Sequence, residues 1–394
     1  MLVMSSCDDN NAPQPADTSS TTLLVYMVAA NSLGVNQTVQ NDIIPSPDKR
    51  DLEEMKEAAR AGALGKNHRV IIFHSTYESD GLLYELKADG QLTQIKEYEG
   101  LSAVTVAGMS RVLDDVQALA PAEKFGIVFW GHGTGWIENG QDETGKTAPA
   151  AAGKSRLSVA DTPVTTSYGP VRSKWMNVTS MRRALEGRDI SFIYFDCCLM
   201  AGVEVAYELR ECTPYIVASP SELPIDGMPY DLNLKELLLA TPNGLRQAAR
   251  NTFDSYNNKT SSIDRTCTIS LICTDALPAL ARAVGDIYAR TPLPHPAAQV
   301  TNYYGSSRQG PNLDLGEYVT ALAAEAGIDT APFDKALADA IPLALATKRI
   351  WDEYPIYTAS GLATYVFNSP SAISNNGYER LEWCRDVAAR HIHD

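Results

Sequence analysis

The chain has 394 residues, of which 44% are hydrophobic and 21% are charged, so it can bury a sizeable core and exceeds a single small domain. Its net charge of −15 argues against a nucleic-acid partner, because no basic stripe is available to neutralise phosphates. The seven cysteines are odd in number and sparsely spaced, so they predict no disulfide framework.

The first residues, from Met1 to Cys7, read as the end of an apolar export signal followed by small residues and a cysteine. They resemble the lipobox of bacterial lipoproteins, in which the cysteine carries lipid, although no basic segment precedes them. Residues 8–22 are rich in Pro, Ser, Thr and Asp and predict a flexible tether. We expect an exported chain anchored to the cell envelope or cell surface through Cys7. A disordered tail with an incidental cysteine is the alternative.

The next hundred residues predict an α/β arrangement, in which buried strands alternate with helices. Continuous apolar runs, typical of central parallel strands, cover residues 23–30, 69–74 and 125–130. Helices are predicted over residues 51–63 and 110–119, and a β-hairpin over residues 82–98. The charged side chains of the first helix are expected to lie opposite its apolar stripe.

The strand over residues 125–130 leads directly into Gly131-His-Gly-Thr-Gly-Trp136. Three glycines at alternate positions let the backbone approach a bound group closely. His132 is therefore presented at the carboxyl end of a buried strand, where open α/β sheets bind their ligands. A Gly-His-Gly sequence by itself is a weak signal.

Residues 139–173 are poor in apolar side chains and predict a long surface loop. Loops of this length are usually functional or disordered. The basic side chains in this loop include Lys146, Lys154 and Arg156. A helix over residues 178–185 follows.

Residues 191–196 predict another buried strand, which ends at Asp196, Cys197 and Cys198. Since side chains two apart in a strand share a face, Asp196 and Cys198 should face the site and Cys197 the core. A helix predicted over residues 199–209 would lower the pKa of the nearby thiol through its N-terminal dipole. Two inert buried thiols, or a strained vicinal disulfide, are the alternatives.

The remainder predicts further helices and strands. Strands are expected over residues 215–219, 266–274 and 361–367, and helices over residues 232–239, 245–256, 278–290, 315–326, 333–345 and 378–391. We divide the chain into a tether (residues 1–22), an α/β core (residues 23–230) and a C-terminal extension (residues 231–394).

His132 and Cys198 both follow buried strands, so in neighbouring strands they would meet over one crevice. A cysteine thiolate is a nucleophile for acyl transfer, and an imidazole can activate it or protonate the leaving amine. The backbone amides of Gly133 and Cys198 could then stabilise an oxyanion. The histidines and cysteines show no metal-ligand spacing, and no phosphate-binding loop is present, so no cofactor is expected.

Residues 129–136, 195–200 and 221–230 resemble the clostripain family of cysteine peptidases, which is grouped with caspases, gingipains and legumain. The resemblance implies a caspase-like fold, with a mostly parallel sheet sandwiched between helices and a C-terminal extension that adds helices and strands. It implies a catalytic dyad of His132 and Cys198, and cleavage after arginine or lysine. Asp196 matches an acidic position of the P1-binding (S1) pocket and Asp226 a second. A structural cap on the following helix is the alternative role for Asp196.

Family members are often cut between the two catalytic residues, which makes Lys146, Lys154 and Arg156 candidate processing sites. Some members depend on calcium; the sequence shows no clear calcium loop, so this question stays open. The expected partners are proteins or peptides with basic residues, and the membrane only through the lipid. The alternative function is a non-catalytic surface-binding lipoprotein on the same scaffold.

Overall fold

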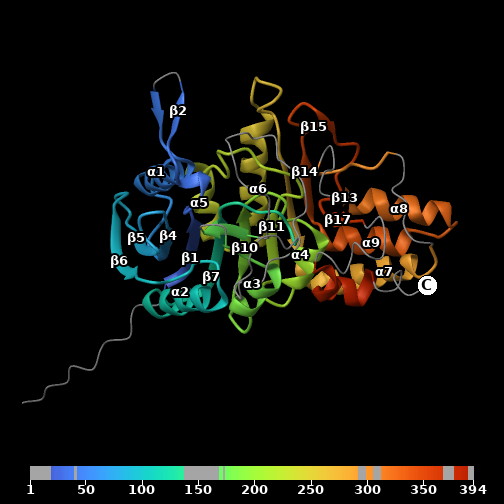
Figure 1. Cartoon of the computed structure of the whole chain (residues 1–394), viewed down its shortest axis with the longest axis horizontal. Helices are drawn as coiled ribbons and strands as arrows, with labels where there is room; N and C mark the ends of the chain where they lie inside the picture. The colour runs from blue at the N-terminus through green and yellow to red at the C-terminus, as the bar shows by residue number, and fades with distance from the viewer. Residues whose placement is uncertain are drawn as a thin grey trace, which may run out of the picture.

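The computed structural model describes residues 19–39, 42–136, 168–171, 174–291, 299–304, 312–366 and 377–388. Within these ranges one large sheet forms the centre of the molecule (Figure 1). Its strands are β1 (Ser19–Val28), β4 (His68–Ser75), β5 (Gly81–Leu86), β6 (Leu92–Tyr98), β7 (Ala122–Trp130), β10 (Phe192–Asp196), β11 (Tyr215–Ala218), β12 (Thr268–Cys273) and β14 (Leu343–Ala346).

The strand order in this sheet is β14-β12-β11-β10-β7-β1-β4-β5-β6. The five central strands, from β11 to β4, are parallel, whereas the strands at both edges add antiparallel pairs. The carboxyl ends of β7 and β10 therefore lie side by side at one rim of the sheet. This rim carries the candidate site.

Helices cover both faces of the sheet, and each face has its own apolar core. One face carries α1 (Pro47–Arg60), α5 (Tyr230–Leu238) and α6 (Pro242–Asn257). The other carries α2 (Val106–Leu119), α3 (Val178–Leu185), α4 (Val203–Glu208) and α7 (Leu277–Tyr288), with α8 (Leu315–Glu325) and α9 (Ala331–Ala340) packed beside α7. Along β1, Leu23 and Val25 enter the first core and Leu24 and Tyr26 the second, because strand side chains alternate. The predicted α/β fold class is confirmed.

Several short strands and helical turns lie outside the central sheet. The 3-10 turn η1 (Ser32–Gly34) follows β1 and leads to a projecting hairpin of β2 (Gln37–Val39) and β3 (Asp42–Ile44). The other small elements are β8 (Tyr168–Val171), β9 (Lys174–Met176), η2 (Thr274–Ala276), β13 (Asn312–Asp314), β15 (Arg349–Ile350), β16 (Tyr354–Pro355), β17 (Ala363–Tyr365), η3 (Tyr378–Arg380) and the π-helical turn η4 (Cys384–Ala388).

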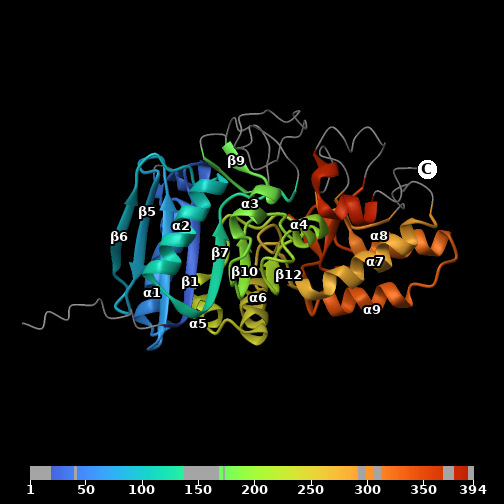
Figure 2. The same ribbon diagram turned by 90° about the horizontal axis from the view of Figure 1, so that it is seen from below.

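The C-terminal part of the chain is built into the central sheet. Both β12 and β14 extend the sheet beyond β11, and the amide of Ala363 bonds the carbonyl of Ala201 at 2.9 Å. Figure 2 shows α7, α8 and α9 packed directly beside the β12 side of the sheet. Side chains of the extension therefore belong to the same two apolar cores as side chains of residues 23–230.

Four local predictions differ from the structure. The helix predicted over residues 333–345 ends at Ala340, because the next Leu-Ala-Leu-Ala segment pairs with β12 as β14. The helix predicted over residues 199–209 forms only from Val203 to Glu208, and the one over residues 378–391 is broken into η3 and η4. The side chain of Asp51 on α1 is buried, at 2% exposure, whereas the amphipathic pattern predicted a solvent-facing position.

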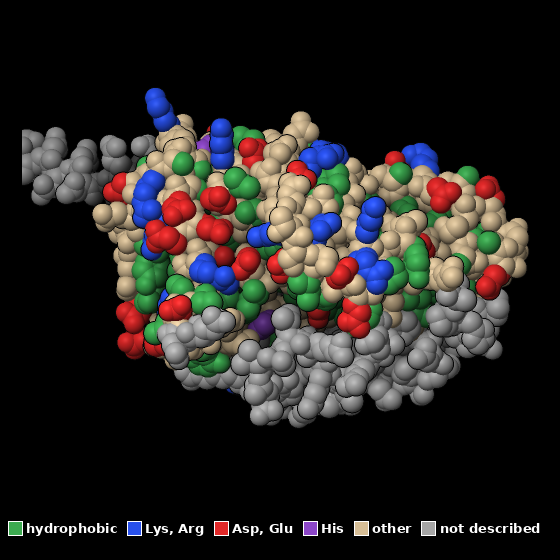
Figure 3. All heavy atoms as spheres, turned by 90° about the horizontal axis from the view of Figure 1, so that it is seen from above, with side chains coloured by type: hydrophobic (Ala, Val, Ile, Leu, Met, Phe, Trp, Pro, Cys, Tyr) green, Lys and Arg blue, Asp and Glu red, His purple; other side chains and the backbone are tan. Residues whose placement is uncertain are grey.

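In the described ranges, no helix is both long enough and apolar enough to span a bilayer. The face that carries α1, α5 and α6 shows acidic and basic side chains intermixed (Figure 3). Cys7, Lys146, Lys154 and Arg156 lie outside the described residues.

Candidate active site

The register of β7 and β10 sets the positions of His132 and Cys198. Trp130 pairs with Asp196 across these parallel strands, and each candidate residue follows its strand by two positions. The two loops also touch, since a Cβ atom added to Gly133 would lie 2.5 Å from the carbonyl oxygen of Cys198. The imidazole and the thiol therefore leave adjacent strands at the same rim.

Glycine is required in the loop after β7 for two reasons. Gly131 has a φ of 150°, a conformation that side chains disfavour. At Gly133 the contact with Cys198 excludes any side chain. The Gly-His-Gly sequence thus lets the histidine loop press against the cysteine loop. Whether the amides of Gly133 and Cys198 stabilise an oxyanion stays a prediction.

His132 is oriented by a residue that sequence reasoning did not single out. Its Nε2 atom lies 2.9 Å from the hydroxyl oxygen of Ser32, which belongs to η1 at the carboxyl end of β1. Burial lowers the pKa of His132 to about 4, so the imidazole is neutral near pH 7. A neutral imidazole can accept a proton.

The neighbouring cysteines face opposite sides of the sheet, as the alternation predicts. Cys197 belongs to the core beneath α2 and α3, and its thiol donates to the carbonyl of Phe129 at 3.1 Å. Cys198 borders the other core and is partly exposed. Both thiols are free, so the vicinal disulfide is absent.

The sulfur of Cys198 is held by the loop that follows β11. The amide of Leu223 donates to the sulfur at 3.3 Å, and the amide of Leu199 bonds the carbonyl of Ser221 at 2.9 Å. Burial, followed by the nearby Glu222 carboxylate, raises the pKa of the Cys198 thiol to about 12. The predicted lowering of this pKa is wrong, because α4 begins only at Val203 and its dipole is not at the sulfur.

Asp196 faces the same side as Cys198 and is nearly buried, at 6% exposure. Its carboxylate accepts from the amide of Met228 at 2.9 Å and from the hydroxyl of Tyr230 at 3.1 Å. Burial raises its pKa to about 7. Asp196 does not cap the following helix, whose N-cap residue is Gly202, so the capping alternative is wrong.

A second buried carboxylate lies close to Asp196. Asp51, on α1, accepts from the indole nitrogen of Trp130 at 2.5 Å. Burial, and then repulsion by Asp196, raises the pKa of Asp51 well above its usual value. No local signal in the sequence marks this pairing, because Asp51 reads as one more charged residue of an amphipathic helix.

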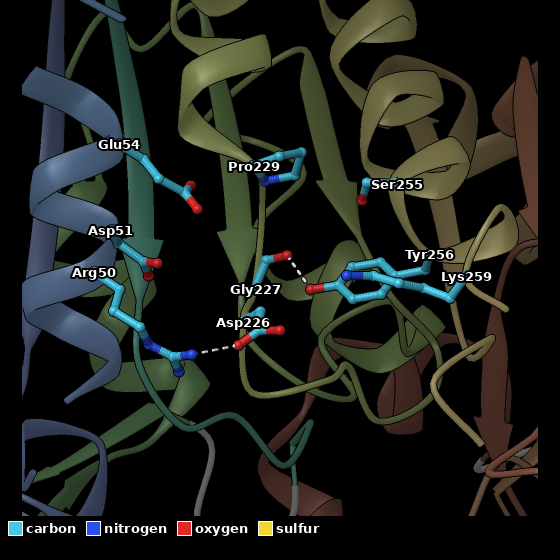
Figure 4. A pocket seen from close by; sticks show the side chains of 9 residues that line it. All are labelled: Arg50, Asp51, Glu54, Asp226, Gly227, Pro229, Ser255, Tyr256 and Lys259. Atoms are coloured by element: carbon cyan, nitrogen blue, oxygen red, sulfur yellow. Dashed lines mark hydrogen bonds and ion pairs between the residues drawn. The ribbon is translucent and has the colours of Figure 1, made fainter. Parts of the chain in front are cut away.

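A pocket of about 270 Å³ opens beside these carboxylates, between α1, α6 and the loop after β11 (Figure 4). The predicted residue Asp226 lines it, and its side chain is 54% exposed and paired with Arg50 at 2.7 Å. Glu54 also lines it and accepts from the amide of Tyr230 at 3.0 Å. Gly227 separates the pocket from Asp196, since a Cβ atom there would lie 2.8 Å from that carboxylate.

Aromatic side chains of the C-terminal extension support both site loops. Trp136, at the end of the histidine loop, packs edge-on against Tyr365 and Tyr378, with ring centroids 5.1 and 4.8 Å away. The indole nitrogen of Trp351 donates to Glu222 at 2.8 Å, next to the residue that holds the sulfur. The extension therefore helps to fix the loops of His132 and Cys198.

This rim can perform acyl transfer, since a thiol, a neutral imidazole and carboxylates gather within a few residues of one strand pair. In the part of the chain that the structure describes, no group of three or more His, Cys, Asp or Glu side chains is arranged to hold a metal ion.

Comparison with known proteins identifies relatives of this arrangement. The model of the clostripain family, peptidase C11, matches residues 25–306. A search of curated proteins returned no match. A secreted C11 cysteine protease from Bacteroides thetaiotaomicron ("iotapain") has a similar fold, with a TM-score of 0.72, 21% identity and coverage of 96% of this chain and 100% of that one.

Two further crystal structures share the fold. An inactive zymogen C11 protease from Parabacteroides distasonis gives a TM-score of 0.74 at 23% identity and covers 95% of this chain and 99% of its own. A secreted C11 protease of B. thetaiotaomicron in complex with an irreversible peptide inhibitor gives 0.71 at 23% identity, with coverages of 93% and 98%.

Proposed function

The chain belongs to the clostripain family of cysteine peptidases, and we propose that it hydrolyses peptide bonds after arginine or lysine with Cys198 and His132 as its catalytic dyad. One observation carries this proposal. The sulfur of Cys198 and the carboxylate of Asp196 share a face at the rim where His132 emerges, beside a pocket lined by further carboxylates.

The proposed reaction uses two proton transfers through His132. Attack of the Cys198 sulfur on the scissile carbonyl forms a C–S bond while the thiol proton passes to His132. Collapse of the tetrahedral intermediate breaks the C–N bond, and His132 protonates the leaving amine. Water, deprotonated by His132, then hydrolyses the thioester and releases the thiol. The backbone amides of Gly133 and Cys198 would stabilise the oxyanion.

The preference for a basic P1 residue rests on Asp196 and Asp226. A buried or half-buried carboxylate is the usual partner of a guanidinium or ammonium group in a binding pocket. Asp226 would contact the P1 side chain from the loop after β11, and Asp196 would act from behind Gly227, which separates it from the pocket. The same pocket is lined by the carboxyl groups of Asp51 and Glu54 and by the cations Arg50 and Lys259.

Activity of single variants on a P1-scanning fluorogenic peptide library tests the proposal. We expect Cys198→Ala and His132→Ala each to abolish cleavage of Arg and Lys peptides. Cys197→Ala is the matched control, since its thiol lies on the opposite face, and it should keep most activity. Loss of activity in Cys197→Ala with survival of Cys198→Ala would reverse the assignment. Failure of an active-site-directed thiol reagent to label Cys198 would favour the non-catalytic binding function.

We further propose that the enzyme is cut by itself in the loop between His132 and Cys198, after Lys146, Lys154 or Arg156. The description of one structural relative as an inactive zymogen supports this idea. Gel analysis beside Cys198→Ala tests it, because an identical intact band in both proteins would count against self-cleavage.

We propose that the protein is exported and lipid-anchored at Cys7, in line with the lipobox-like sequence and with a structural relative described as secreted. Labelling cells with a radioactive fatty acid should mark the wild type and not Cys7→Ser. We propose no cofactor, and assay after treatment with a chelator will show whether calcium contributes.

A further inference from the structure

The pocket beside Asp226 already holds a guanidinium group, supplied by the protein itself. Arg50 extends from α1 across the pocket, and its Nη1 atom lies 2.7 Å from Oδ1 of Asp226, although the two residues are 176 positions apart in the chain (Figure 4). Arg50 is therefore paired with the carboxylate that we propose as the partner of the substrate's P1 side chain.

The ion pair is partly exposed to solvent, so another cation can take the place of Arg50 at Asp226. The side chain of Arg50 is 34% exposed and that of Asp226 is 54% exposed. An exposed ion pair of this kind favours its paired state over its separated state by a factor of up to about five. A substrate cation can therefore displace Arg50 at a small cost.

A second carboxylate is available to the displaced guanidinium. Glu54 follows Arg50 by four positions on α1, so both side chains lie on one face of the helix and line the same pocket. Glu54 is held by a neutral donor, the amide of Tyr230. Asp51 is likewise held by the indole of Trp130. Glu54 is therefore the neighbouring carboxyl group to which a displaced Arg50 could turn.

We propose that Arg50 competes with the P1 side chain of the substrate for Asp226, and that this competition disfavours arginine more than lysine. The reason is geometric. A substrate guanidinium binds best when it pairs with both carboxylate oxygens, and Arg50 occupies Oδ1. An ammonium group needs only one oxygen and can use Oδ2. This inference rests on the proposed function.

The variant Arg50→Gln tests this role with three matched fluorogenic peptides that differ only in a P1 residue of arginine, lysine or glutamine. We expect kcat/KM for the arginine peptide to rise about three- to fivefold through a lower KM. The lysine peptide should gain less than twofold, and the glutamine peptide should not change. Arg60→Gln removes another exposed arginine of α1, which pairs with Glu53, and should change none of the three values.

A double variant separates competition from a general charge effect. Asp226→Asn should weaken cleavage of both basic peptides, and adding Arg50→Gln to it should bring no further gain. The same gain in both backgrounds, equal gains for arginine and lysine, or a loss in Arg50→Gln would overturn the role of Arg50. In each of these cases, cleavage of basic peptides by the wild type leaves the proposed function standing.

Failure of the proposed function gives a different result, because the wild type would then show no preference for the arginine and lysine peptides, or would cleave none of the three, and the inference would fall with it. Binding supplies a readout without turnover. Agmatine and cadaverine mimic the arginine and lysine side chains, and thermal stabilisation of Cys198→Ala by each can be compared with and without Arg50→Gln. Only agmatine should bind several-fold more tightly when Arg50 is removed, and unchanged agmatine binding contradicts the inference.

Discussion

Two adjacent residues, Cys197 and Cys198, show how one peptide bond can place two thiols in different surroundings. The thiol of Cys197 is buried and donates to the carbonyl of Phe129, which ties the end of β10 to β7. The thiol of Cys198 faces the pocket side and is held by Leu223. In the resting protein the raised pKa of Cys198 and the lowered pKa of His132 both favour a neutral thiol beside a neutral imidazole.

We therefore predict that Cys198 in the free enzyme reacts as a thiol with a high pKa. Since the thiolate is the reactive form, its alkylation by iodoacetamide should accelerate about tenfold per pH unit from pH 7 to pH 9. Peptide mapping by mass spectrometry, with Cys198→Ala as the blank, measures this rate. A rate that is already constant between pH 5 and pH 8 would indicate a preformed thiolate–imidazolium pair and contradict the prediction.

The sequence predicted part of this site for a simple physical reason. Strand alternation is local, so Asp196 and Cys198 could be assigned to one face and Cys197 to the other without coordinates. Ser32 and Asp51 act through contacts between segments about 80 to 100 residues apart, with His132 and Trp130. No short pattern marks such contacts, and the depth at which α1 packs decides that Asp51 is buried.

At the level of elements, the short helix α4 is joined to the C-terminal extension by a buried carboxylate. Glu204 is fully buried, and its Oε1 atom accepts from the hydroxyl of Thr364 at 3.0 Å and the amide of Tyr365 at 2.9 Å. Among the described residues its Oε2 atom has no hydrogen-bond partner. Burial raises the pKa of Glu204 to about 7.

This carboxyl should make the fold less stable as the pH rises from 4.5 to 7. In that range folded Glu204 keeps its proton and unfolded Glu204, whose pKa has the ordinary value of 4.5, loses it, so the free energy of unfolding falls by up to about 3 kcal/mol. Glu204→Gln cannot titrate, so its stability relative to wild type should be higher at pH 8 than at pH 5. Urea unfolding at both pH values measures the difference.

A matched control is Glu53→Gln on α1, because Glu53 is exposed and should give the same relative stability at both pH values. If Glu204→Gln loses as much stability relative to wild type at pH 8 as at pH 5, Glu204 is not protonated in the folded protein.

Helices and strands were predicted well where their own hydrophobic pattern determines the structure. They were predicted poorly where the packing of a neighbouring element determines it. The apolar runs of β1, β4 and β7 indicated central strands because burial on both faces demands them. The Leu-Ala-Leu-Ala sequence of β14 favours a helix by propensity, and it becomes a strand only because β12 offers a free edge.

At the scale of the whole molecule, the division at Tyr230 stays a prediction, and the contacts argue that the two parts fold together. Removing residues 231–394 would expose the edge of β11 and uncover both cores, which α6 and α7 help to close. It would also remove the aromatic contacts of Trp136.

We predict that a fragment of residues 19–230 does not fold cooperatively, since it loses a large share of its buried apolar surface. The full chain should unfold in one transition that includes the extension. Near-UV circular dichroism and size-exclusion chromatography of the fragment provide the measurement. A compact fragment with a sharp unfolding transition would show that the extension is an independent domain.

The direction of the strands places one exposed turn far from the candidate site, where the protein can be modified. The turn between β5 and β6 lies at the rim opposite the one where β7 and β10 end, and Ala88 and Asp89 there point into solvent. A fluorophore or an affinity handle attached at these positions would lie at the opposite end of the strands from Cys198. In immobilised or labelled enzyme made in this way, the attached group should not interfere with peptide binding at the rim of His132 and Cys198.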